Sequence, residues 1–286
     1  MIFDNRLCTL GEGPLWHPER EQMFWFDIVN QKMLSQDRDG QREWRFPEMV
    51  SAAGWVDQDV LLIAGERDLF LFDIESEEVE TVCLLEQDKP KNRPNDGRAD
   101  PAGRIWISTL VDARTPATAA LYCIESSLAQ LKIPDLIVGN GLAFSPQGTS
   151  AFLCDTRHKC IWRFDFDCST GNLSNARTIK HYTEGTARPD GACFADDGSY
   201  WVAILEGYRL ERFSEQGEFI ESISVPLAKP TMPCFGGEQG NILLVTSAQT
   251  NDKLPNKPGF ENASLIACET RFKGHAEAFA NARHLG

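Results

Sequence analysis

Four short motifs in this sequence place a carboxylate or an amide at the same distance before a turn. They read GEGPLWHP, RPNDGRADP, NGLAFSP and RPDGACFAD, and the turn residues are Pro18, Pro101, Pro146 and Asp196. Six positions before each turn residue stands a polar side chain, and the four are Glu12, Asn95, Asn140 and Asp190. If the motifs are copies of one repeat, these side chains occupy one structural position, so they could converge on a common site.

The repeat extends to two weaker copies, which place Ser51 before Asp57 and Thr231 before Gly237. Successive copies start 39 to 50 residues apart, and each contains further apolar runs that alternate with polar residues and end at Gly, Asp or Pro turns. This pattern predicts an all-β fold, a six-bladed β-propeller with four-stranded antiparallel blades around a central channel. We expect one domain over residues 1–286, and we expect segment 1–10 to supply a strand that closes the ring against the last blade.

In a propeller the first strand of each blade lines the channel, so the six equivalent positions should form a ring near one mouth. Polar residues there could simply be solvated or form turns, since Asn and Asp favour turns. Two carboxylates and two amides converging from four blades would, however, repel or stay unsatisfied without a cation. An all-oxygen set suits Ca²⁺, Mg²⁺ or Mn²⁺, with Fe²⁺ or Zn²⁺ as alternatives, and three protein ligands would leave room for water and substrate.

The composition narrows the class of protein. A net charge of −14 and the absence of a basic stretch argue against binding to nucleic acid or to a membrane surface. The N-terminal segment lacks a signal-peptide pattern, and the nine cysteines, an odd number, show no CxxC pair. These features favour a reducing, cytoplasmic location. We expect a small-molecule partner and a protein that is a monomer or a weak homo-oligomer.

Several motifs together resemble the SMP-30/gluconolactonase/regucalcin family, in particular its bacterial sugar lactonases. They are LGEGPLWHPE, RPNDGRADPAGR, NGLAFSP, RPDGACFADDG and CFGG followed by LLVTSA, in the family's order from about Leu10 to Ala248. The resemblance implies a six-bladed propeller with one divalent cation in the channel. We take Ca²⁺ as the first candidate, with Zn²⁺, Mn²⁺, Mg²⁺ and Fe²⁺ as alternatives. Carried over by position, the family's metal ligands fall on Glu12, Asn140 and Asp190.

The resemblance also implies substrate contacts at Arg93 and Asn95 of the RPNDG motif. Some members carry a Glu shortly after the second strand of the third blade, where this chain has Ala113 with Asp112 beside it. We therefore assign Asp112 to the substrate site, and the sugar is left open by this departure.

The expected activity is metal-dependent hydrolysis of an aldonolactone to its aldonic acid, as in gluconolactonases and arabinonolactonases. Asp190 is our candidate for the general base that activates water, while Arg93 and Asn95 would orient the sugar ring. No Ser nucleophile is expected, because the chain lacks G-x-S-x-G. Two alternatives stay open: a calcium-binding, regucalcin-like regulatory protein without significant turnover, and an organophosphate hydrolase that uses the same site.

Overall fold

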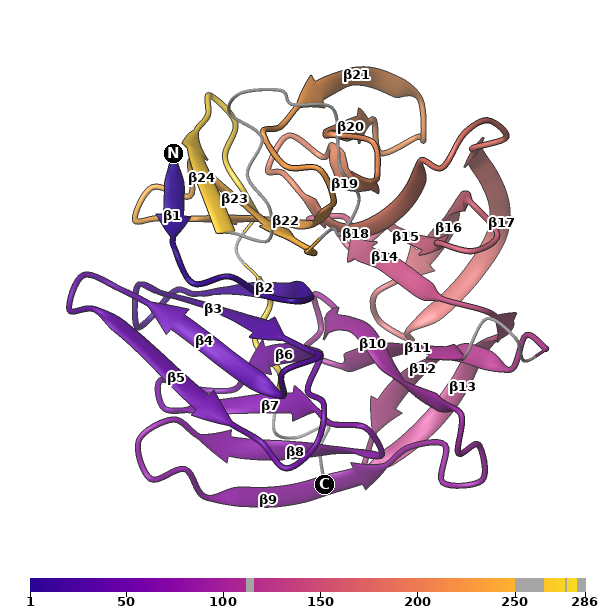
Figure 1. The fold of residues 1–286 in the computed structure, drawn as a ribbon. Helices are drawn as coiled ribbons and strands as arrows, with labels where there is room; N and C mark the ends of the chain where they lie inside the picture. The colour runs from indigo at the N-terminus through magenta and orange to yellow at the C-terminus, as the bar shows by residue number, and fades with distance from the viewer. Residues whose placement is uncertain (112–115, 250–264, 276, 282–286) are drawn as a thin grey trace.

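The structure is a computed structural model that describes residues 1–111, 116–249, 265–275 and 277–281. Asp112 and Ala113, which the sequence analysis placed near the substrate, lie outside these residues. The described chain forms six antiparallel four-stranded sheets arranged around a centre (Figure 1), which confirms the predicted six-bladed propeller. No helix among the described residues is long and apolar enough to cross a membrane.

The first three blades follow one another along the chain. The first contains β2 (Gly11–His17), β3 (Gln22–Asp27), β4 (Lys32–Gln36) and β5 (Gln41–Arg45). The second contains β6 (Ala52–Trp55), β7 (Val60–Ala64), β8 (Asp68–Asp73) and β9 (Val79–Leu84). The third contains β10 (Asn92–Ala99), β11 (Ile105–Val111), β12 (Ala119–Glu125) and β13 (Leu128–Leu136).

The last three blades complete the ring. The fourth contains β14 (Gly139–Phe144), β15 (Ser150–Asp155), β16 (Cys160–Asp167) and β17 (Asn172–His181). The fifth contains β18 (Arg188–Phe194), β19 (Tyr200–Leu205), β20 (Arg209–Phe213) and β21 (Phe219–Ser224). The sixth combines β22 (Pro230–Gly236), β23 (Ile242–Ser247) and β24 (Leu265–Glu269) with the N-terminal strand β1 (Ile2–Asp4).

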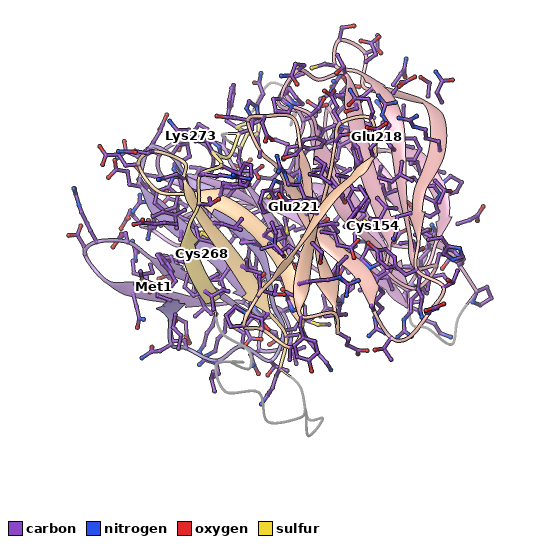
Figure 2. All side chains as sticks on the ribbon, turned by 90° about the horizontal axis from the view of Figure 1, so that it is seen from above. Met1, Cys154, Glu218, Glu221, Cys268 and Lys273 are labelled. Atoms are coloured by element: carbon purple, nitrogen blue, oxygen red, sulfur yellow. The ribbon has the colours of Figure 1, made fainter. Side chains whose placement is uncertain are left out.

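The N-terminal strand closes the ring, as predicted. β1 pairs antiparallel with β24, and the amino group of Met1 donates a hydrogen bond to the carbonyl of Ala267 (2.7 Å). Figure 2 labels Met1, the residue before β1, and Cys268 of β24. Because the first and last segments share one sheet, the ring has no free junction between its ends.

Apolar side chains fill the space between neighbouring blades. Six clusters of buried residues lie at the six blade junctions, and each draws residues from two adjacent sheets. At one junction the Trp106 ring of β11 packs against Phe144 of β14, with the ring centroids 5.4 Å apart. The inner and central strands are buried on both faces, so successive side chains pack alternately against the two neighbouring blades, and the clusters hold the inner strands in place.

The C-terminal segment crosses the end of the channel where the inner strands finish. After β24, Gly274 bridges to Ala195, the Ala280 amide donates to the Trp55 carbonyl (2.7 Å), and the Asn281 amide donates to the Gly103 carbonyl (2.9 Å). These contacts reach the fifth, second and third blades in turn. The opposite end of the channel, where the inner strands begin, is the end that carries the predicted ring.

Candidate active site

The six inner strands contact one another in a closed circle, β2–β6–β10–β14–β18–β22. Five of them interrupt their pairing at the predicted ring position, whereas β6 pairs regularly with β7. Such β-bulges bend a strand and re-aim a side chain, and they are frequent next to active sites. The ring residues are Glu12, Ser51, Asn95, Asn140, Asp190 and Thr231.

Two of the predicted metal ligands are in direct contact. Asn140 Nδ2 donates a hydrogen bond to Asp190 Oδ1 (2.5 Å) and another to Thr156 Oγ1 (3.1 Å). Both side chains are buried, as is Glu12, whose Oε2 accepts a hydrogen bond from the Gly13 amide (3.0 Å). The structure therefore brings Asn140 and Asp190 together, and Glu12 occupies the equivalent position of the repeat on β2.

The buried carboxyls at this end of the channel disturb one another. Burial raises the pKa of Glu12 well above its usual value, and the charges of Asp190 and Asp96 raise it further. Burial also raises the pKa of Asp190, with a second contribution from Asp96. Like charges held together away from water destabilise the ionised form of each group. The positive charges of Arg93 and Arg188 oppose these shifts but do not reverse them.

Asp96 is a member of this group that the sequence analysis missed. It is buried, burial raises its pKa, and its Oδ2 accepts a hydrogen bond from the Leu142 amide (3.0 Å). The repeat register selected Asn95, one residue earlier, and only the bulge at this point of β10 decides which neighbour turns inward. The adjacent polar pair in RPNDG was the signal that could have identified Asp96.

The backbone beside Asn140 is held from a neighbouring blade. Gly141 has a φ of +58°, and a Cβ there would lie 2.5 Å from Cys154 Sγ and 2.7 Å from the Tyr200 hydroxyl oxygen. The Tyr200 hydroxyl donates a hydrogen bond to the Gly141 carbonyl (2.7 Å) and lies 3.2 Å from Cys154 Sγ. Only glycine fits this left-handed, crowded position, so its presence fixes the bulge that presents Asn140.

The donor set fits a hard divalent cation. The side chain of Asn140 forms two hydrogen bonds with described residues, and both use Nδ2. Its Oδ1 is therefore left for a ligand. Glu12 and Asp190 add carboxylate oxygens, and burial raises the pKa of both groups well above its usual value against the opposing charges of Arg93 and Arg188. Among the described residues no group of three His, Cys, Asp or Glu side chains is arranged to hold a metal. The set proposed here consists of two carboxylates and one amide. All three can offer oxygen atoms, which are the ligands that a hard divalent cation prefers.

The other predicted residues lie around this group. Asn95 Nδ2 donates to the Gly139 carbonyl (2.9 Å), and Arg93 Nη1 donates to the Pro94 carbonyl (2.8 Å). Both side chains are half-buried, so part of each remains accessible. Thr231 Oγ1 lies 2.8 Å from Thr246 Oγ1 and donates to the Gly11 carbonyl, which ties the sixth blade to the first. The role of Thr231 is therefore explained by the packing of blades.

The fold is a six-bladed propeller, and buried acidic side chains gather where its inner strands begin. The family description "SMP-30/Gluconolactonase/LRE-like region" matches residues 10–249, and the chain belongs to this family. The family inferred from the sequence motifs is thus confirmed.

Named relatives share about a third of their residues with this chain. A 6-deoxy-6-sulfogluconolactonase of Pseudomonas putida is 32% identical over 247 residues, which cover 85% of this chain and 84% of the relative. An L-arabinolactonase of Azospirillum brasilense is 29% identical and covers 97% of this chain and 94% of its own. The crystal structure of a calcium-binding regucalcin from Agrobacterium tumefaciens superposes with a TM-score of 0.90 at 26% identity, over 98% of this chain and 96% of that one.

Proposed function

We propose that this protein hydrolyses a sugar lactone to the corresponding hydroxy acid, with one divalent cation held by Glu12, Asn140 and Asp190. The observation that carries the proposal is the buried contact of Asn140 with Asp190 beside a second buried carboxyl, Glu12, whose pKa is raised by burial and by Asp190. Such a group needs a cation to be stable at neutral pH. The lactonase names of two relatives support the reaction class.

A bound divalent cation would act as a Lewis acid that polarises the lactone carbonyl. Asp190 accepts the proton of the water that attacks the carbonyl carbon, and it returns this proton to the ring oxygen when the carbon–oxygen bond breaks. Arg93 and Asn95, at the start of β10, donate hydrogen bonds to the sugar and hold the carbonyl toward the water. Asn140 holds Asp190 Oδ1 in place through its Nδ2 hydrogen bond.

A titration of released acid at constant pH tests the proposal. A panel of sugar lactones is supplied to protein that has been treated with chelator and then reloaded with Ca²⁺, Zn²⁺, Mn²⁺, Mg²⁺ or Fe²⁺ separately. We expect chelation to abolish hydrolysis and one or more of these cations to restore it. Full hydrolysis by protein shown by elemental analysis to be metal-free would contradict the proposal.

Calorimetry separates catalysis from binding alone. Glu12→Gln should weaken binding of the activating cation, because it replaces a charged ligand by a neutral one. Glu43→Gln is the matched control because it removes the same charge far from the channel. Glu43 lies on β5, the outermost strand of the same blade, and forms an ion pair with Lys32 of β4 (3.0 Å). Cation binding without turnover of any lactone would instead support a regulatory binding protein.

A further inference from the structure

Arg98 is a buried cation on the inner strand β10, and the proposed mechanism does not use it. Its guanidinium reaches two partners. Nη2 donates a hydrogen bond to the Ala192 carbonyl of β18 (2.5 Å), and Nη1 lies 3.1 Å from Glu277 Oε1 of the C-terminal segment. Hydrogen bonds from a charged donor are among the stronger contacts of a protein interior. One side chain thus joins the third blade to the fifth blade and to the segment that crosses the channel.

The carbonyl that Arg98 holds lies at the end of the bulge that presents Asp190. Regular pairing of β18 with β19 stops at Pro189 and resumes at Ala192, so Asp190 and Gly191 have no partner in the ladder. A bulge disrupts the hydrogen bonds that fix a strand, so the orientation of its residues depends on other contacts. Arg98 supplies such a contact two residues after Asp190.

Asp96, also on β10, makes the corresponding contact with β14. Regular pairing of β14 with β15 is interrupted after Asn140, and the Leu142 amide inside this interruption donates a hydrogen bond to Asp96 Oδ2 (3.0 Å). Leu142 follows Asn140 by two residues, just as the residue held by Arg98 follows Asp190. The two proposed metal ligands are therefore supported at the same place in their repeats, and both supports come from one strand.

Asp96 and Arg98 also support each other. The bulge of β10 lies before Asp96, and pairing with β11 is regular from Asp96 to Ala99, so the two side chains point to the same face of the strand. Burial raises the pKa of Asp96, and the charge of Arg98 is the largest effect that opposes this rise. Glu277 gives the guanidinium a second negative partner. Arg98 is thus held in place by its own contacts.

We propose that Arg98 is a positioning residue for the cation site, which it maintains by holding the bulge of Asp190 directly and the bulge of Asn140 through Asp96. This inference rests on the proposed lactonase function, because that function assigns a cation to Asn140 and Asp190. Arg98 acts through the backbone of the ligands and contacts neither the cation nor the sugar. Loss of a group that orients a metal ligand lowers metal affinity or activity by about 10- to 100-fold.

Arg98→Lys tests the proposal without a change of net charge. An ammonium is a single point charge and does not reproduce the fork of a guanidinium, so it does not hold Ala192 and Glu277 together. Metal-free protein is titrated in a calorimeter with Ca²⁺, Zn²⁺, Mn²⁺, Mg²⁺ or Fe²⁺ separately. We expect about 10-fold weaker binding of the cation that the unchanged protein binds. At saturating cation, kcat should fall by about the same factor while KM changes little, because Arg98 does not contact the sugar.

Arg104→Lys is the matched control. Arg104 is also buried and also joins a carboxylate to a carbonyl: its Nε lies 2.7 Å from Asp100 Oδ2, and its Nη2 donates to the Cys168 carbonyl (2.6 Å). None of these partners belongs to the bulges of β14 and β18. Both variants should lose stability in a denaturant titration, whereas only Arg98→Lys should lose cation affinity.

Arg98→Met separates position from charge by the sign of the effect. By charge alone, removal of a positive group from the channel should strengthen the binding of a cation. Loss of the support should instead weaken it by about 10-fold or more. If this variant does not fold, because Asp96 and Glu277 lose their cation, the comparison of Arg98→Lys with Arg104→Lys decides the proposal.

The outcomes separate the two proposals. If Arg98→Lys binds the cation as tightly as the unchanged protein, or if Arg104→Lys loses as much affinity, Arg98 contributes only to stability. The inference is then wrong and the lactonase function stands. Tighter binding by Arg98→Met would also overturn the inference, because the charge of Arg98 would then matter and not its contacts. If no cation binds the unchanged protein, the proposed cation site fails and the inference fails with it.

Discussion

The two ends of the channel treat buried acids in opposite ways. Where the inner strands finish, Asp100 is fully satisfied: its oxygens accept hydrogen bonds from the Ala102 and Arg104 amides, from Arg104 Nε (2.7 Å) and from Trp106 Nε1 (2.9 Å). Where the strands begin, Glu12 and Asp190 share the interior with Asp96 and their pKa values are raised by burial. Asp100 is neutralised by the buried guanidinium of Arg104 and stabilises the fold, whereas Glu12 and Asp190 have hydrogen-bond donors but no ion pair with a described residue, as suits acids that bind a ligand.

The C-terminal segment covers the far end of the channel. Five copies of the repeat carry an aromatic residue two positions before the turn, but the third copy has Ala99. Ala280 of the C-terminal segment is fully buried in the same apolar cluster as Ala99, and Phe279 packs against Trp55 with ring centroids 5.8 Å apart. The small residue leaves space for the segment that crosses the channel. The far end of the channel is thus explained by stability, and the acidic end is where we propose that chemistry takes place.

The largest effect on activity is expected at the acidic end. Asp190→Asn keeps an oxygen ligand of similar size but removes the base, so kcat should fall by about 10²- to 10⁴-fold while part of the metal stays bound. The measurement is kcat beside metal content, because a change of charge also weakens the cation. Normal turnover at full occupancy would show that Asp190 is only a ligand.

The corresponding substitution at the far end of the channel, at Asp100, should affect stability and not activity. Asp100→Ala leaves Arg104 as a buried charge without its partner, which should lower the free energy of unfolding by about 3–5 kcal/mol. Denaturant titration measures this loss. At a temperature where the variant is folded, kcat/KM should equal that of the unchanged protein. A loss of activity as large as that of Asp190→Asn would remove the contrast between the two ends.

The stability of the metal-free protein should depend on pH because of the buried carboxyls of Glu12 and Asp190. Because burial raises the folded-state pKa of Glu12 and Asp190, the folded protein binds more protons than the unfolded chain. Stability should therefore fall as pH rises above the usual pKa values of these groups, 4.5 for Glu12 and 3.8 for Asp190. Glu12→Gln should therefore stabilise the metal-free protein at neutral pH. With metal bound, Glu12→Gln should instead destabilise the protein, because a cation that binds more weakly adds less to the free energy of unfolding.

Thermal unfolding at pH 5 and pH 7.5, with and without the activating cation, provides the measurement. Glu43→Gln again serves as the control and should show no such reversal. If Glu12→Gln destabilises the protein equally with and without metal, the carboxyl is part of the packing and the acidic end resembles the far end.

The sequence predicted the architecture well because the repeat marks every blade. A common register of the repeat predicts the ring positions, the closing strand and the convergence of Asn140 and Asp190. This register holds in the structure because all six blades pack in the same way. Asp96 was missed because a one-residue bulge, which the spacing does not encode, decides whether Asn95 or Asp96 turns inward. The C-terminal crossing was also not predicted, since it lacks the repeat and depends on Ala99 in a distant blade. The metal role of Glu12, Asn140 and Asp190 stays a prediction.

A pair of tyrosines in one apolar cluster offers the finest comparison. Tyr200 and Tyr182 are both buried between the fourth and fifth blades, and each hydroxyl makes one strong hydrogen bond, to the Gly141 carbonyl (2.7 Å) and to Glu211 Oε2 (2.7 Å) respectively. Replacing Tyr200 by Phe should lower the free energy of unfolding by about 1 kcal/mol, and replacing Tyr182 by Phe, which removes a hydrogen bond to a carboxylate, should lower it by roughly 1.5–3 kcal/mol. Both variants lose stability, so stability alone does not show which tyrosine supports the proposed metal site.

Metal affinity should distinguish them. Tyr200 holds the carbonyl next to Asn140, and loss of a group that orients a metal ligand costs about 10-fold in affinity or activity at the low end of its range. Tyr200→Phe should reach this value in calorimetric titration with the activating cation, whereas Tyr182→Phe should bind as the unchanged protein does. The Phe152 ring stacks on Tyr200 with centroids 4.5 Å apart, so Phe at position 200 keeps the packing and only the hydroxyl is lost. Equal affinities in the two variants would mean that Gly141 needs no support from Tyr200, and that the bulge alone presents Asn140.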